Sequence, residues 1–376
     1  MRCPRCLAAL LLAALSMLLL LSGCNTDTTA SESVAEPVSP MELTYATQFS
    51  VDKYANGCRL VTIANDRYLV VPEGITPPGD LDENIVLLQQ PLDNIYLVAT
   101  SAMDLFRALD SLDCVRLSGT DADGWYIPEA KQAIENGKML YAGKYNAPDY
   151  ERILSEGCNL AVESTMIYHT PEIKEQLERL GIPVLVERSS YEAHPLGRME
   201  WIKLYGVLLG REDEAEQIFS QATAALEPIL KQPSTDKTVA FFYINSTGTV
   251  NVHKSGDYIS EMIRMAGGIY ALQDLTDTGN ALSTMNMDME SFYAAAKDAD
   301  VLIYNSTIDG ELKDLEQLLE KSELLTDFKA VQNGDVWCTG QNMFQESMAL
   351  GQMILEIHTI LTENEPGDLE YLYRLQ

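Results

Sequence analysis

The stretch LAVESTMIYHTPEIKEQLERLGIPVLVE, residues 160–187, contains one complete strand–helix–strand unit. Its apolar residues 160–162 predict one strand, and the apolar residues 183–186 predict a second. Pro171 suits the first turn of a helix and Gly181 suits its end, so the segment between the strands is expected to be helical. Strands joined in this way pair in parallel, and helices cover both faces of such a sheet. The unit therefore indicates an α/β fold.

The same alternation continues on both sides of this unit. Towards the N-terminus, the patterns predict strands at 60–63, 68–71, 95–99, 115–117 and 140–141, and helices at 102–109, 127–135 and 148–154. Further on, they predict strands at 239–243, 301–304 and 336–338, and helices at 258–265, 289–296 and 347–361. The alternation is thus interrupted once, between about 196 and 235.

That interruption is helical in pattern and divides the chain into two parts. A helix is expected at 196–209, and after Gly210 one long helix is expected from about 212 to 231. Chains as long as 376 residues usually fold around more than one hydrophobic core, so two lobes are expected. The predicted fold is α/β, with two Rossmann-like lobes whose central sheets are mostly parallel and which one long interdomain helix joins. The lobes are expected at 41–195 and 236–376, with the connector at 196–235.

The first residues predict export and attachment to a membrane. Arg2 and Arg5 precede an apolar run at 7–21, which is short for a membrane span but typical of a signal peptide. Leu21-Ser22-Gly23-Cys24 then resembles a bacterial lipobox, in which the Cys24 thiol receives a lipid. We expect residues 1–23 to be a lipoprotein signal peptide and the polar residues 24–40 to be a flexible tether. The alternative is an uncleaved helix that ends in an ordinary cysteine.

Charge and cysteine spacing exclude several kinds of partner and site. The formal net charge of −30 argues against nucleic acid and against binding flat on an anionic bilayer, so only the lipid is expected to contact the membrane. Cys3 and Cys6 lie inside the predicted signal peptide. The four other cysteines besides Cys24 are too widely spaced for a zinc site; they are expected to be free thiols, with a disulfide as the alternative. They are Cys58, Cys114, Cys158 and Cys338.

Candidate ligand-binding residues follow from position. In open α/β sheets a ligand binds beyond the carboxyl ends of the strands. The residues chosen there are Ser101, Lys144, Tyr145, Tyr168, Arg188, Tyr191, His194, Arg198, Tyr243 and Asn305. The arginines could hold a carboxylate or a catecholate, and His194 or Tyr191 could reach a metal inside a bound complex. The alternative for 187–198 is an internal ion-pair network that fixes the loop.

Nothing in the sequence predicts catalysis. G-x-S-x-G, the P-loop, H-E-x-x-H and the Rossmann glycine fingerprint are all missing from it. We therefore expect no catalytic residue, no intrinsic cofactor and no metal held by the protein alone.

Several segments, in this order, resemble class III solute-binding proteins, which bind ferric siderophores, cobalamin or haem for ABC importers. The segments are 147–154, 158–162, 177–184, 208–215, 265–268 and 330–337. This resemblance covers about 60–361, whereas the stretch 43–91 is longer than the usual opening of the family. It implies a monomer that closes two lobes on one small molecule and docks on a permease, which works with its ATPase. Glu151 and Glu290 match the acidic docking residues of the family.

The expected ligand is a ferric siderophore or a similar metal chelate. A corrinoid such as cobalamin and then haem are the alternatives in the same role. A lipid-anchored hydrolase and an interaction lipoprotein are the alternatives from other classes.

Overall fold

The computed structural model describes residues 37–79, 81–276 and 283–376. The predicted signal peptide, Cys24 and the predicted tether up to residue 36 lie outside these residues. Residues 37–77 and 82–376 belong to one compact unit, which holds every strand and helix named below. Among the helices described, none combines the length and the apolar character that crossing a membrane requires.

An N-terminal sheet precedes the first lobe. Its strands run in the order β1 (Ser39–Pro40), β2 (Phe49–Lys53), β3 (Arg59–Ile63), β4 (Asp66–Val71) and β5 (Ile85–Gln89). Neighbouring strands are antiparallel except β4 and β5, which are parallel. The sequence predicted β3 and β4 but not the other three strands. Because Ser39 and Pro40 pair with β2, the predicted tether extends two residues too far at its C-terminal end.

The sheet of the first lobe is parallel throughout. Its strand order is β12 (Val184–Glu187), β11 (Leu160–Ser164), β6 (Ile95–Leu97), β7 (Val115–Ser118) and β8 (Leu140–Tyr141). The chain adds strands on one side of β6 and then on the other, so β6 marks the point where the strand order reverses. The helices are α2 (Met103–Ala108), α3 (Pro128–Glu135), α4 (Tyr150–Ser155) and α5 (Pro171–Arg179).

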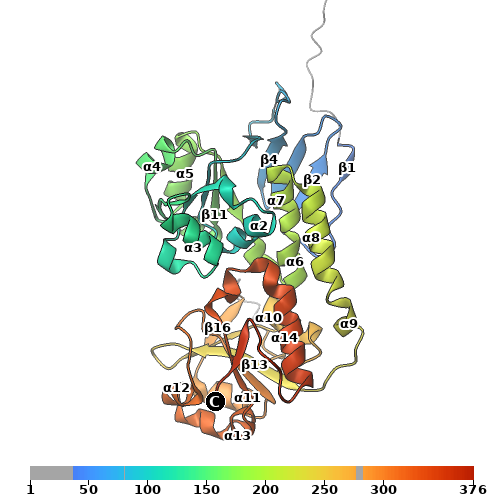
Figure 1. Cartoon of the computed structure of the whole chain (residues 1–376), viewed down its shortest axis with the longest axis vertical. Helices are drawn as coiled ribbons and strands as arrows, with labels where there is room; N and C mark the ends of the chain where they lie inside the picture. Colours follow the sequence, from blue (N-terminus) through green and yellow to red (C-terminus); the bar gives the residue numbers. More distant parts are fainter. Residues whose placement is uncertain (1–36, 80, 277–282) are drawn as a thin grey trace, which may run out of the picture. The chain divides into compact units, whose positions relative to one another are not determined.

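Alternation along β11 sends neighbouring side chains to two different cores. Leu160 and Val162 join the main hydrophobic core, whereas Ala161 packs with Ile153 of α4 and Leu177 of α5. Figure 1 shows α4 and α5 beside β11. This is the period of two that a strand imposes on its side chains. The parallel sheet predicted from residues 160–187 is confirmed.

The connector is a set of four short helices rather than one long helix. They are α6 (Pro195–Glu200), α7 (Ile202–Leu209), α8 (Glu212–Ala224) and α9 (Glu227–Leu230). The single helix predicted over 212–231 is wrong because Pro228 lies inside it. A proline ring collides with the carbonyl four residues earlier, here that of Ala224, where α8 ends.

Two glycines shape this connector. Gly210 ends α7 with φ +69°, a conformation that favours glycine. At Gly206 an added Cβ would lie 2.6 Å from the Cβ of Ala215, so only a glycine lets α7 and α8 pack this closely. Figure 1 shows these two helices side by side.

The sheet of the second lobe is mixed. Its order is β16 (Thr284–Met287), β14 (Val250–His253), β13 (Thr238–Ile244), β17 (Val301–Tyr304), β18 (Val336–Thr339) and β19 (Leu372–Arg374), and β15 (Ile269–Tyr270) also pairs with β13. The central pairs are parallel, and the outer strands β14, β16 and β19 are antiparallel to their neighbours. The helices are α10 (Tyr258–Met265), α11 (Met289–Ala296), α12 (Leu315–Lys321), α13 (Lys329–Asn333) and α14 (Leu350–Thr362).

The four cysteines within the described residues form no disulfide. Cys58 and Cys338 are buried, and Cys114 and Cys158 are partly buried. Burial raises the pKa of each thiol, which keeps it protonated and unreactive at neutral pH. The prediction of free thiols is confirmed.

Candidate functional site

A cavity of about 490 Å³ has walls from both lobes. The first lobe contributes loops at the carboxyl ends of β6, β11 and β12, and the second lobe contributes β13, β14 and the loop after β17. The lining residues are Ala99, Thr100, Ser101, Ser164, Thr165, Met166, Glu187, Ser190, Arg198, Tyr243, Asn251, His253, Tyr258, Ser283, Thr284, Asn305, Ile308 and Phe344. The cavity thus lies where the strand order of the first sheet reverses, which is the expected place for a ligand.

Glu187 is the carboxylic acid and Arg198 the guanidinium among the described side chains that line the cavity. Glu187 is buried, and this burial raises the pKa of its carboxyl group, although hydrogen bonds and Arg198 oppose the shift. Its Oε1 accepts from the Ser189 backbone N–H at 2.9 Å, and its Oε2 lies 3.5 Å from the Ser101 hydroxyl, which donates to it.

Arg198 holds its own loop in place. Its Nε donates to the Glu192 carbonyl at 3.1 Å and its Nη2 donates to the Ser190 carbonyl at 2.8 Å. Its guanidinium carbon lies 3.5 Å from the centre of the Tyr258 ring, which belongs to the second lobe. Hydrogen bonds to backbone carbonyls therefore fix this loop, rather than the internal ion-pair network that was the alternative for 187–198.

One face of the β13–β14–β16 strands forms the opposite wall. Tyr243 pairs with Asn251, and two residues further along β14 His253 pairs with Thr284, so these side chains share one face. Asn305 follows β17, and its Oδ1 accepts from the backbone N–H of Thr307 at 3.1 Å and from its hydroxyl at 2.6 Å. This amide fixes the loop that carries Ile308.

The structure brings four of the ten predicted ligand residues to this cavity: Ser101, Arg198, Tyr243 and Asn305. Lys144 and Tyr145 line an adjoining cavity of about 340 Å³, which shares Thr100 and Ser164 with the first. Four others, Tyr168, Arg188, Tyr191 and His194, line neither of these two cavities.

The loop geometry explains why Arg188, Tyr191 and His194 lie elsewhere. Residues Ser189–Tyr191 form a 3₁₀ turn, and Arg188 packs on the Tyr191 ring at 4.4 Å and reaches the Tyr168 hydroxyl at 3.3 Å. Both nitrogens of His194 are engaged: Nδ1 accepts from the Leu196 backbone N–H at 3.1 Å, and Nε2 lies 3.5 Å from Glu261. Of the four ligand candidates in this loop, Arg188, Tyr191, His194 and Arg198, Arg198 is the one that lines the cavity.

Sequence reasoning missed several lining residues. Asn251 and His253 were missed because β14 is four residues long and was not predicted as a strand. Its sequence, Val250-Asn251-Val252-His253, alternates apolar and polar side chains, which was the available signal. Phe344 follows a strand that was predicted, but no local pattern shows that it turns towards the first lobe.

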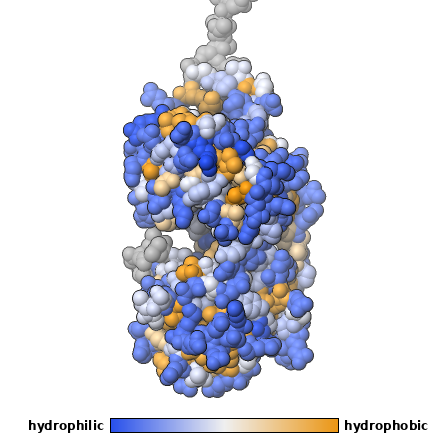
Figure 2. Space-filling model, turned by 60° about the vertical axis from the view of Figure 1, so that its left-hand side comes forward, coloured by the Kyte–Doolittle hydropathy of each residue, from blue (hydrophilic) through white to orange (hydrophobic). Residues whose placement is uncertain are grey.

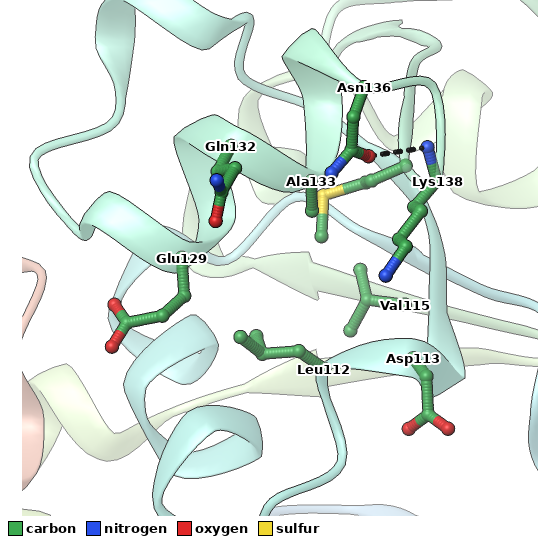
Figure 3. Close-up of a pocket in the computed structure, with 9 residues that line it drawn as sticks. Leu112, Asp113, Val115, Glu129, Gln132, Ala133, Asn136 and Lys138 are labelled. Carbon is green, nitrogen blue, oxygen red and sulfur yellow. Dashed lines mark hydrogen bonds between the residues drawn. The ribbon is translucent and has the colours of Figure 1, made fainter.

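A separate groove of about 420 Å³ lies on the first lobe between β7 and α3. Figure 3 shows that its carboxylates, on Asp113 and Glu129, lie on opposite sides, and that the Lys138 backbone N–H donates to Asn136. It shares no residue with the cavity between the lobes. None of the predicted ligand residues lines it.

The two predicted docking residues are both exposed. Glu151 lies in the first turn of α4 and Glu290 in the first turn of α11, and an aspartate caps each helix just before them. Neither glutamate forms an ion pair with another of the described residues. Figure 2 shows that the visible face of the molecule is mostly hydrophilic, with scattered hydrophobic patches.

The chain resembles known proteins in sequence and solved structures in fold. Its sequence matches the model of the periplasmic binding protein family over residues 115–343. An uncharacterised lipoprotein of Methanocaldococcus jannaschii is 24% identical over 294 residues, covering 75% of this chain and 68% of that protein. A second uncharacterised protein of the same organism is 25% identical over 310 residues, covering 79% and 91%.

Solved structures share the fold. A periplasmic haem-binding protein from Pseudomonas aeruginosa aligns with TM-score 0.59 at 15% identity, covering 76% of this chain and 98% of that one. The petrobactin-binding protein of Bacillus subtilis aligns with TM-score 0.57 at 15% identity, covering 72% and 93%. Both the family match and these folds agree with the resemblance found in the sequence. The chain therefore belongs to the periplasmic binding protein family.

Proposed function

We propose that this chain is the extracytoplasmic binding component of an ABC importer and holds a metal chelate, such as a ferric siderophore, between its lobes. The observation that carries the proposal is the cavity of about 490 Å³, whose walls come from both lobes of a periplasmic binding protein. Its volume lies within the usual range for small-molecule sites. A corrinoid or haem is the alternative ligand in the same role. The chain is proposed to act without catalysis, as a monomer attached to the membrane through lipidated Cys24.

The charge of the cavity favours a chelate with little net negative charge. Among the described lining residues, Arg198 is the one arginine or lysine, and its guanidinium already contacts two carbonyls and the Tyr258 ring. Arg188, expected from the sequence to hold an anion, does not reach the cavity. The other polar groups are mainly hydroxyls and amides, which suit a neutral hydroxamate complex better than a ferric tricatecholate.

Apolar contact is the second feature of the proposed ligand. Met166 of the first lobe and Ile308 of the second line the cavity and remain 45% and 61% exposed. Phe344 adds an aromatic side chain. Large apolar side chains that are exposed in a cleft indicate a binding site for a ligand with apolar surface of its own.

A thermal-shift panel tests the ligand class. The panel contains ferrichrome, a ferric tricatecholate, cyanocobalamin and ferric haem. A ligand at 100 times its Kd adds about 2.7 kcal/mol of stability, which raises the Tm by roughly 5 °C. We expect ferrichrome to raise the Tm more than the tricatecholate. If none of the four chelates shifts the Tm, the proposed ligand class is wrong.

Docking on the permease is proposed to use Glu151 and Glu290. Because both are exposed carboxylates outside the cavity, their replacement by alanine should leave ligand affinity unchanged and reduce uptake by cells at least tenfold. The matched control replaces Glu172 and Glu316, which are exposed in the first turns of α5 and α12. Normal uptake by the Glu151→Ala/Glu290→Ala double variant would exclude this docking role.

A further inference from the structure

His253 lies where a guest in the cavity would meet it. It ends β14, and its side chain is 8% exposed and lines the cavity. The strand register puts it on the same face as Asn251, and opposite Thr284 on β16. The small exposed part of the ring is therefore directed at the space between the lobes.

The ring is held in one orientation. Its Nδ1 lies 2.6 Å from Asp257 Oδ1, and the same oxygen accepts from the Ile259 backbone N–H at 3.0 Å as the cap of α10. Phe241 and Tyr258 pack edge-on against the imidazole, with ring centres 5.5 and 6.1 Å away. The Tyr270 hydroxyl also donates to the His253 carbonyl at 2.7 Å, which fixes the end of the strand.

This arrangement determines the tautomer. An ionised carboxylate only accepts hydrogen bonds, so the proton between the two residues belongs to Nδ1. A neutral ring then carries its lone pair on Nε2. Across the described residues, Nε2 meets no hydrogen-bond partner. A histidine that only fills a core is expected to have both nitrogens satisfied or one in bulk water.

We propose that Nε2 of His253 binds the metal ion of the captured chelate directly, and that Asp257 acts as the positioning residue that orients the ring. Histidines that ligate metals usually donate their other N–H to a carboxylate, which fixes the ring and makes the free nitrogen a better donor. The inference rests on the proposed function and narrows it. The ligand would be a chelate that leaves at least one coordination position of the metal open, in contrast to a saturated complex.

Two ferric probes separate these classes. One is the 1:1 iron complex of a linear dihydroxamate, which leaves two positions open, and the other is ferrichrome, whose three hydroxamates fill all six. We expect the wild-type protein to bind the open complex at least tenfold more tightly than ferrichrome and to shift its visible absorption band. His253→Ala should weaken binding of the open complex at least tenfold more than binding of ferrichrome and should remove the spectral shift, and added imidazole should restore the shift.

Each outcome has one meaning. A purely structural role for His253 would lower both affinities together and would overturn the inference. Preference for the open complex that survives His253→Ala would also overturn it. Ferrichrome binding without binding of the open complex would exclude metal ligation but would leave the proposed function intact. Binding of neither probe would overturn the inference, and the proposed function would then stand or fall with the thermal-shift panel.

A second variant and a measurement on the ligand-free protein show whether misfolding of His253→Ala explains its behaviour. His253→Gln keeps a polar side chain of similar length beside Asp257, and it should retain ferrichrome binding but not the preference. In the free wild-type protein, ¹⁵N NMR of the imidazole should show a proton on Nδ1 and none on Nε2 at pH 8. A protonated Nε2 in a neutral ring would contradict the proposed geometry.

Discussion

Replacing Glu200 with alanine is expected to lower the free energy of unfolding by roughly 3–5 kcal/mol. Glu200 is fully buried in α6 and accepts from three consecutive backbone N–H groups, those of Thr44, Tyr45 and Ala46, at 2.7–2.9 Å. It also pairs with Lys203 at 3.1 Å. Without the carboxylate, these three partly buried donors lose their acceptor, and the buried Lys203 loses one of its two partners.

The chain offers a matched control for this effect. Glu216 contacts the same Lys203 at 2.9 Å, but its side chain is 59% exposed. Because Glu216 is exposed and Lys203 keeps Glu200 as a partner, Glu216→Ala should change stability by about 0–1 kcal/mol. Urea denaturation of both variants measures the difference. Equal losses would show that the ion pair with Lys203, and not the three backbone donors, gives Glu200 its importance.

The second large effect concerns Glu163, whose removal should stabilise the protein. This carboxyl group lies on β11 beside the small core under α4 and α5, and neither of its oxygens has a hydrogen-bond partner within the described part of the chain. Burial raises its pKa from 4.5 to about 8. The folded protein therefore keeps the Glu163 proton at pH 7, whereas the unfolded chain releases it.

The sign of the pH dependence follows from this difference. Between about pH 4.5 and pH 8 the folded state binds more protons at this site than the unfolded state, so stability falls as pH rises. At pH 7 the accumulated cost is about 3 kcal/mol. Glu163→Gln removes the titration, so the variant should be more stable by about this amount at pH 7 and the same as the wild type near pH 4.

Denaturation at several pH values tests this prediction. The stability of Glu163→Gln should depend less on pH than that of the wild type, and the curves should separate steadily above pH 4.5. Glu172→Gln, at an exposed position of the same lobe, serves as the control and should follow the wild type. Parallel curves for Glu163→Gln and the wild type would show that Glu163 is ionised in the folded protein.

Elements with local signals were predictable from sequence. Pro171 and Gly181 mark the ends of α5, and Asp288 caps α11 by accepting from the Ser291 backbone N–H. The N-terminal sheet was only partly predictable because β1 has two residues, too few to show a strand pattern, and is defined by its pairing with β2. The break between α8 and α9 was predictable, since Pro228 has no N–H to donate to the Ala224 carbonyl and its ring collides with that carbonyl.

Some residues of the site were likewise predictable from sequence and others were not. Position at a strand end was enough to find Ser101, Tyr243 and Asn305, because parallel strands bring their carboxyl ends to one edge. It failed for Arg188, which packs on the Tyr191 ring beside the 3₁₀ turn, and for His194, which caps α6 with Nδ1. Residue types in that loop suggested an anion site, whereas the backbone carbonyls that occupy Arg198 could only be seen in three dimensions.

The central claim is that the ligand lies between the lobes and touches both walls. Isothermal titration with the chelate that gives the largest thermal shift tests it on three variants. Ser164→Trp obstructs the wall of the first lobe, Asn251→Trp obstructs the wall of the second, and Gln132→Trp fills the separate groove as the control. The account predicts that each of the first two substitutions weakens binding at least a hundredfold and that the third leaves it unchanged. Full affinity in either wall variant, or loss of binding in the groove variant, would contradict it.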